Sequence, residues 1–167
     1  NFDVMVKNAL KKILSPSQPN SDGEAILEGL GVWNGDRVEL DHSKYASHYL
    51  DKVDEKGEGS VLNRDEILEC HYEKQNLWYD IEFHLEHEFV FVLLTAMAFE
   101  GEIEINWSGR KKISASNIDE VTNLNAEDYF TFRHIKKPKD APTKALKALF
   151  RALELPDMTN ELDKPET

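Results

Sequence analysis

The stretch EHEFVFVLLTAMAFEGEIEINW, residues 86–107, decides the fold. Its first part, Glu86 to Phe99, is apolar on nearly every side, which predicts a helix buried at the centre of the protein. Gly101 is placed to end that helix. Glu102 to Trp107 then alternates between polar and apolar residues, which indicates a strand. We therefore expect a central helix with this strand folded beside it.

The strand continues into a predicted β-hairpin. Ser108-Gly109 is typical of a turn, and Arg110 to Ala115 alternates less cleanly as the return strand. Upstream, Leu77 to Leu85 alternates over a longer run and predicts another strand. Two helices are expected before it, Asp41 to Lys56 and a short one from the cap residue Asn63 through Cys70.

These elements follow one another as helix, short helix, strand, long helix and hairpin, which is the order of a winged helix. The predicted fold class is therefore α+β, mainly helical, with a winged-helix-like core and flanking helices. We expect an N-terminal helical segment (1–40), the winged-helix-like domain (41–116), a C-terminal helical segment packed on it (117–156) and a flexible tail (157–167).

The flanking segments show helical periodicity as well. Phe2 to Leu14 is amphipathic, and a capping box at Ser21 predicts a second helix that ends at Gly31. Pro142 to Leu155 is another amphipathic helix with a basic outer face. His134 to Asp140 is rich in lysine and contains a proline, so we interpret it as a connector. A second capping box, Asn117 to Glu120, is expected to open a short helix, and a further helical turn is expected at 125–132.

Composition excludes several classes of protein. With 40% hydrophobic residues the chain can form a core, so it is not an intrinsically disordered protein. Its single cysteine, Cys70, excludes a disulfide framework and suggests a reducing, cytoplasmic location. The apolar run from Phe89 to Phe99 is about half of the ~20 residues that a membrane span needs. Because the sequence begins at Asn1 without a methionine, we expect it to be an internal piece of a larger protein.

Charge is distributed unevenly along the chain. The net charge is −12, yet residues 110–151 contain ten basic and five acidic residues, so this stretch is positive. A protein with such a charge dipole is suited to docking on a complementary protein surface. We predict that the contact residues for other domains or partner subunits are Trp107, Arg110, Lys111, Lys112, Arg133, Lys136, Lys137, Lys139, Lys144, Lys147 and Arg151.

DNA binding through the hairpin and the segment from Arg133 to Lys139 is the alternative interpretation. A DNA-reading helix needs basic and polar residues that face the major groove. The helix in that position, Glu86 to Phe99, has no lysine or arginine and carries two glutamates in its first turn. Burial explains this helix better, so the sequence favours protein contacts over DNA.

No motif for catalysis or for a cofactor is present. The chain lacks GxxxxGK[ST], GxSxG and GxGxxG, so a P-loop, a nucleophile elbow and a dinucleotide fingerprint are all missing. Cys70-His71, His84 and His87 do not have the spacing of a zinc site. We therefore expect a non-catalytic chain that binds neither a metal nor a cofactor.

Seven short stretches together resemble one family of proteins. They are Ser43–Ala46, Gly57–Ile67, Glu88–Leu94, Gly101–Ile105, Ser116–Glu120, Phe132–Lys139 and Ala145–Phe150. The chain is similar over about residues 25–155 to a segment of the PglY-like large ATPases of phage-growth-limitation and BREX-type bacterial defence systems. This resemblance implies an internal module of a bacterial ATPase whose nucleotide site lies elsewhere in the polypeptide. It transfers no catalytic residue, because the shared stretches carry structure rather than chemistry.

Overall fold

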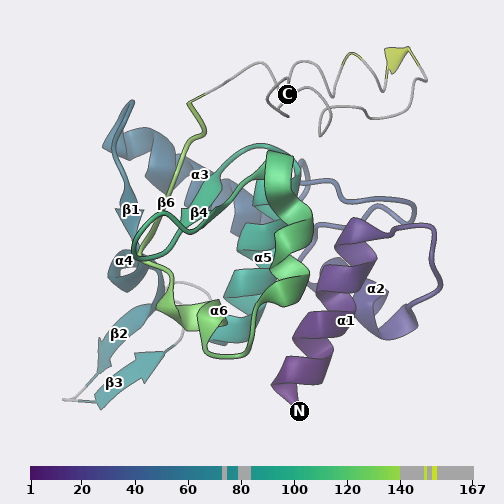
Figure 1. Ribbon diagram of the computed structural model, residues 1–167, viewed down its shortest axis with the longest axis horizontal. Helices are drawn as coiled ribbons and strands as arrows, with labels where there is room; N and C mark the ends of the chain where they lie inside the picture. Colours follow the sequence, from purple (N-terminus) through teal and green to yellow (C-terminus); the bar gives the residue numbers. More distant parts are fainter. Residues whose placement is uncertain (73–74, 79–83, 140–148, 150–151, 154–167) are drawn as a thin grey trace.

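The computed structural model describes residues 1–72, 75–78, 84–139, 149 and 152–153. Within them the chain is α+β and mainly helical, which confirms the predicted fold class. Figure 1 shows the helices gathered around α5, with the sheet on one side of it. The helices are α1 (Phe2–Leu14), α2 (Ser21–Gly29), α3 (Lys44–Lys56), α4 (Arg64–Leu68), α5 (His87–Phe99), the 3-10 helix η1 (Ala115–Asn123) and α6 (Asp128–Thr131).

Two antiparallel sheets accompany these helices. The larger has the strand order β1-β6-β4-β5, so β6 lies between the first strand and the hairpin. The smaller is the β2–β3 hairpin, which stands away from the body of the protein in Figure 1. The strands are β1 (Leu62–Asn63), β2 (Glu69–Tyr72), β3 (Gln75–Trp78), β4 (Glu104–Asn106), β5 (Lys112–Ile113) and β6 (His134–Lys136).

Helix α5 forms the centre of the core, as the sequence predicts. Every side chain from Val90 to Ala98 is buried, because the helix is apolar on all sides and has neighbours on all sides. Helices α1, α3, α6 and η1 contact it, as does strand β4. Thr95, the polar residue among the buried ones, donates its hydroxyl hydrogen to the Phe91 carbonyl 2.9 Å away and so adds no unpaired group to the core.

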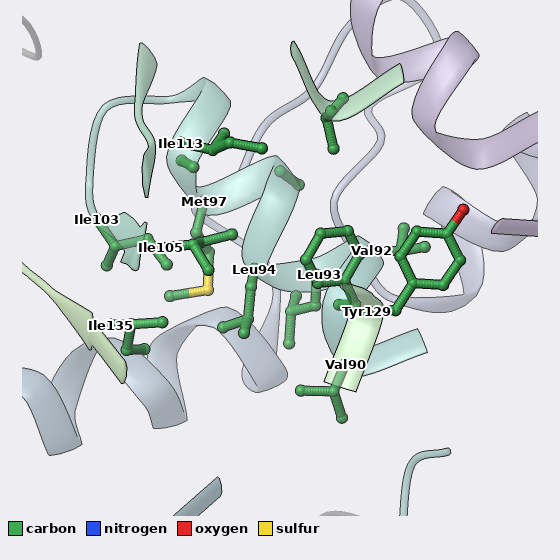
Figure 2. Close-up of a cluster of buried hydrophobic side chains, with 14 of the residues drawn as sticks. Val90, Val92, Leu93, Leu94, Met97, Ile103, Ile105, Ile113, Tyr129 and Ile135 are labelled. Atoms are coloured by element: carbon green, nitrogen blue, oxygen red, sulfur yellow. The ribbon is translucent and has the colours of Figure 1, made fainter. Parts of the chain in front are cut away.

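One face of the four-stranded sheet completes this core. Figure 2 shows Ile105, Ile113 and Ile135 from three different strands converging with Met97 of α5. The strands are short, and their alternation turns every second residue toward the helix. Because these isoleucines are at most 1% exposed, the sheet is attached to α5 by close apolar packing.

Three predictions about strands and helices need correction. His134–Lys136 is the strand β6 and not part of a connector. Cys70 lies in strand β2, because helix α4 ends at Leu68. The strand predicted from Leu77 begins earlier, at Gln75, and its β3 segment ends at Trp78, while residues 79–83 lie outside the described part of the chain. Three residues of alternation, flanked by Arg133 and Lys137, are too few for β6 to be detected from sequence.

Other predicted elements are present with shifted ends. The cap of α2 is Asn20, whose side chain accepts from the Gly23 amide, rather than Ser21. The helix predicted from Asn117 starts earlier, after the cap residue Ser114. The predicted helix over 142–155 lies outside the described residues except for Leu149, Ala152 and Leu153, and the predicted tail over 157–167 lies wholly outside them.

Candidate interaction surface

The outer sheet face, turned away from α5, is polar across all four strands. Strand pairing sets Asn63 opposite His134, His134 opposite Asn106, and Asn106 opposite Lys112. One step along β4 and β6, Glu104 is opposite Lys136. Directly opposed residues share a face of a sheet. We therefore define the outer sheet face as Asn63, Glu104, Asn106, Lys112, His134 and Lys136.

Glu104 is the least exposed charged group on this face, with 6% of its side chain accessible. Its carboxylate forms ion pairs with two lysines, with one oxygen 3.2 Å from Lys136 Nζ and the other 3.6 Å from Lys112 Nζ. The Asn106 amide is within 3.4 Å on the same side. A carboxylate at this depth requires cationic partners, and it has one on each neighbouring strand. Glu104 therefore holds both lysines at the surface of β4.

The lysine hollow lies next to this group of charges. It is a depression of about 350 Å³ that is bounded by β4, β5, β6 and the start of η1. Its lining includes Glu104, Lys112, Lys136 and Lys139, together with Ser114 and Ser116. The Lys112 side chain is 56% exposed, so its ammonium group is accessible to the solvent at the hollow even though it pairs with Glu104. Three lysines and one glutamate leave the site with a net positive charge.

His134 occupies the middle of the outer sheet face. Partial burial lowers the pKa of its imidazole, and the positive charges of Lys136 and Arg133 lower it further, while Glu104 opposes them. The neutral ring is therefore favoured in the folded protein. This places an uncharged donor and acceptor between Asn63 and Asn106, beside the lysine hollow.

Trp107, a predicted contact residue, has its ring turned into the protein and is 6% exposed. Its Nε1–H donates to the Asp128 carbonyl at 3.0 Å. Lys111 covers it from outside, with Nζ 5.1 Å from the ring centre and 2.9 Å from Asp128 Oδ1. Although partial burial opposes it, hydrogen bonds from the Asn125 amide and Lys111 lower the pKa of Asp128. A partner at this position would meet Lys111 before the indole.

The other predicted contact residues are spread over the surface. Arg110 lies exposed at the hairpin turn, and Lys137 forms an ion pair with Asp54 of α3. The Arg133 guanidinium is exposed and 3.4 Å from Ser108 Oγ. Lys144, Lys147 and Arg151 lie outside the described residues. The structure thus brings Lys112, Lys136 and Lys139 together around one hollow, sets Lys111 over Trp107, and places Lys137 in an ion pair with Asp54.

Four members of the outer sheet face were not predicted from the sequence: Asn63, Glu104, Asn106 and His134. The alternation in Glu102–Trp107 does place Glu104 and Asn106 on one side of a strand. This alternation does not indicate that β6 pairs with β4. That pairing is what places Lys136 opposite Glu104 and His134 opposite Asn106. The missing signal was the strand His134–Lys136 itself.

Among the residues that the structure describes, no three histidine, cysteine, aspartate or glutamate side chains lie close enough to hold a metal ion. The helices in the described ranges are all too short, or too polar, to cross a lipid bilayer.

Comparison with known proteins gives one match. The chain matches the model of "Family of unknown function (DUF6079) 4th domain" over residues 2–137, which include α1 through β6 and therefore the outer sheet face. No curated protein and no solved structure matches the chain. The match extends over most of the sequence, so the chain belongs to the DUF6079 family and corresponds to its 4th domain.

Proposed function

We propose that this chain is a non-catalytic module of a larger protein and that it docks through its outer sheet face on another domain or subunit. The family description supports the larger protein, since a 4th domain implies other domains in the same polypeptide. The observation that carries the docking role is the Lys112–Glu104–Lys136 cluster. It concentrates positive charge on one face of a chain whose net charge is −12.

Steric accessibility is consistent with this role. Lys112 pairs with Glu104 but keeps more than half of its side chain accessible, and Lys139 is exposed at the edge of the same concave surface. A hollow with charged walls is complementary to a protruding, oppositely charged segment. Domains of one chain commonly meet through interfaces of this polar kind.

The finer assignment is part of the same proposal. The order α3, α4, α5 and the β4–β5 hairpin supports a winged-helix-like core. The resemblance to PglY-like ATPases supports a role in phage defence, with nucleotide hydrolysis in another part of the polypeptide. On this proposal the module transmits or maintains contacts within the ATPase and does not itself react with nucleotide.

DNA binding remains the second candidate, supported by exposed Arg110 and Arg133 near the hairpin. Two observations make it the weaker one. Helix α5 is buried and has no basic residue to place in a groove. Outside residues 110–151 the chain is strongly acidic, since its net charge is −12 while that stretch is positive, and this acidity would repel a phosphate backbone.

A steric block of the surface tests the docking proposal without changing charge. Ser116→Trp places a bulky ring at the lysine hollow, and Ser47→Trp places the same ring at an exposed site on α3. Association of the purified chain with the remaining domains of its parent polypeptide is measured by biolayer interferometry. We expect Ser116→Trp to weaken binding at least about tenfold, a loss of ~1.4 kcal/mol, and Ser47→Trp to leave it within about twofold.

Absence of association in the wild-type protein, or equal loss in both variants, would overturn the docking role. Circular dichroism confirms that each variant is folded. The same proteins are titrated with duplex DNA at low and moderate salt. Binding whose affinity falls steeply with salt, with a slope equivalent to several phosphates, would favour the DNA alternative instead.

A further inference from the structure

We propose that the lysine hollow binds an extended acidic polypeptide segment, in which carboxylates of the partner pair with Lys112, Lys136 and Lys139. This inference rests on the docking role proposed above and names the chemistry of the partner. It uses the two lysines that already flank Glu104, at 3.6 and 3.2 Å, and Lys139, which borders the same hollow.

The first argument concerns unused hydrogen-bond donors. A lysine ammonium has three N–H groups, and Glu104 engages Lys112 and Lys136 through one oxygen each. Each lysine therefore retains donors for a second carboxylate. Because Glu104 is nearly buried, it fixes the two ammonium groups in place before a partner arrives. Such preorganisation reduces the entropy lost when a partner binds.

The second argument distinguishes a carboxylate from a phosphoryl group. Recognition of phosphate favours arginine forks or a nest of backbone amides, whereas these lysines act as point charges. The hydroxyls of Ser114 and Ser116 are already hydrogen-bonded to each other at 2.9 Å. A phosphoryl group carries close to two negative charges at pH 7 and would lie beside Glu104. A carboxylate carries one and meets less repulsion.

The third argument concerns spacing. Lys112 and Lys136 lie on strands that flank β4 on either side, and they pair with Asn106 and Glu104, which are two residues apart along β4. Their backbones are therefore roughly 12 Å apart. Alternate side chains of an extended peptide point the same way and are roughly 7 Å apart. The long lysine side chains accommodate this difference, as their convergence on Glu104 demonstrates. An acidic segment with carboxylates at alternate positions therefore fits the hollow.

The test is isothermal titration calorimetry at low salt, in which the full chain is titrated with a short peptide that alternates glutamate with serine. The matched control peptide has glutamine in place of glutamate. Lys112→Gln with Lys139→Gln removes two charges at the hollow, and both side chains are exposed, so the fold should persist. Lys7→Gln with Lys11→Gln removes two charges from the exposed surface of α1.

We expect the acidic peptide to bind the wild-type chain, and the hollow variant to bind it about tenfold more weakly, with the α1 variant within about twofold. Added salt should weaken binding and the glutamine peptide should not bind. Equal affinities of the two variants, or inorganic phosphate that binds as tightly as the peptide, would overturn the inference. If the parent domains still associate while the acidic peptide does not bind, the docking role stands and only the acidic partner is refuted.

Discussion

The two faces of the four-stranded sheet are built from neighbouring residues yet have opposite characters. Ile105, Ile113 and Ile135 face α5 and are almost inaccessible to solvent. Glu104, Lys112 and His134, each next to one of these isoleucines, face outward. The inner face gains free energy from apolar burial. Apart from the nearly buried Glu104, the outer face gains little from its ion pairs, since partly exposed pairs contribute weakly to stability.

This difference separates residues that hold the protein together from residues that are free to bind. An apolar side chain in a closely packed core cannot be changed without leaving a cavity. A lysine at the surface can be changed at small cost, so its position need not be explained by folding. The same kind of substitution should therefore change the free energy of unfolding by different amounts on the two faces, and the two changes can be compared directly.

The largest effect is expected from Ile135→Ala on the inner face. Removing this buried side chain beside Met97 and Ile105 leaves a cavity, and we expect the free energy of unfolding to fall by about 2–5 kcal/mol. The matched variant is His134→Ala, one residue earlier on the outer face, with an expected change of about 0.5 kcal/mol at pH 8. Urea denaturation followed by fluorescence measures both. Similar losses in the two variants would contradict the division between the faces.

The second prediction examines the deepest group of the outer face. Glu104→Gln keeps the shape of the side chain but leaves Lys112 and Lys136 without their shared carboxylate. We expect a loss of about 1–2 kcal/mol, less than for a fully buried pair because both lysines retain contact with water. Glu120→Gln, at an exposed position of η1, is the control and should be neutral. A neutral Glu104→Gln would show that the cluster does not stabilise the sheet.

The sequence was sufficient to predict the helix and the hairpin that build most of the inner face, but it predicted neither the contribution of Ile135 from β6 nor the outer face. The long apolar run of α5 has only one reasonable location, the core, and the β4–β5 hairpin follows from local alternation and a glycine turn. The burial of α5 and the position of Trp107 beside it were both confirmed, with the rings of Phe91 and Trp107 6.1 Å apart.

The outer face depends on a pairing between distant segments. Strand β6 pairs with β1 and β4, which are far from it in sequence, and its three residues carry too short a pattern to predict this. Lys112 and Lys136 were predicted as contact residues from charge alone, but their meeting at Glu104 was not. Composition can therefore indicate that a surface is basic, whereas only tertiary structure reveals which lysines share a site.

A smaller effect is expected from the pH dependence contributed by His134. Burial, then Lys136 and Arg133, holds its pKa below the ordinary value of 6.5 in the folded protein. As the pH falls through 6.5, His134 therefore takes up a proton in the unfolded chain before it does so in the folded protein. The contribution of neutral His134 to the free energy of unfolding is thus present above that pH and is lost below it. We expect wild type to lose more stability between pH 8 and 5.5 than His134→Gln, measured by urea denaturation at each pH. Parallel pH profiles would contradict the contribution from His134.

The smallest effect is expected where the outer face ends. Lys137 follows Lys136 directly but pairs with Asp54, and both side chains are more than half exposed. Because such pairs are well solvated, Lys137→Gln should change the free energy of unfolding by less than about 0.5 kcal/mol, and 1 M salt should remove the difference. Lys136→Gln, which deprives nearly buried Glu104 of its closer partner, should cost more and should retain part of its effect in salt. Equal responses of the two neighbouring lysines would mean that depth on this face does not govern the strength of its ion pairs.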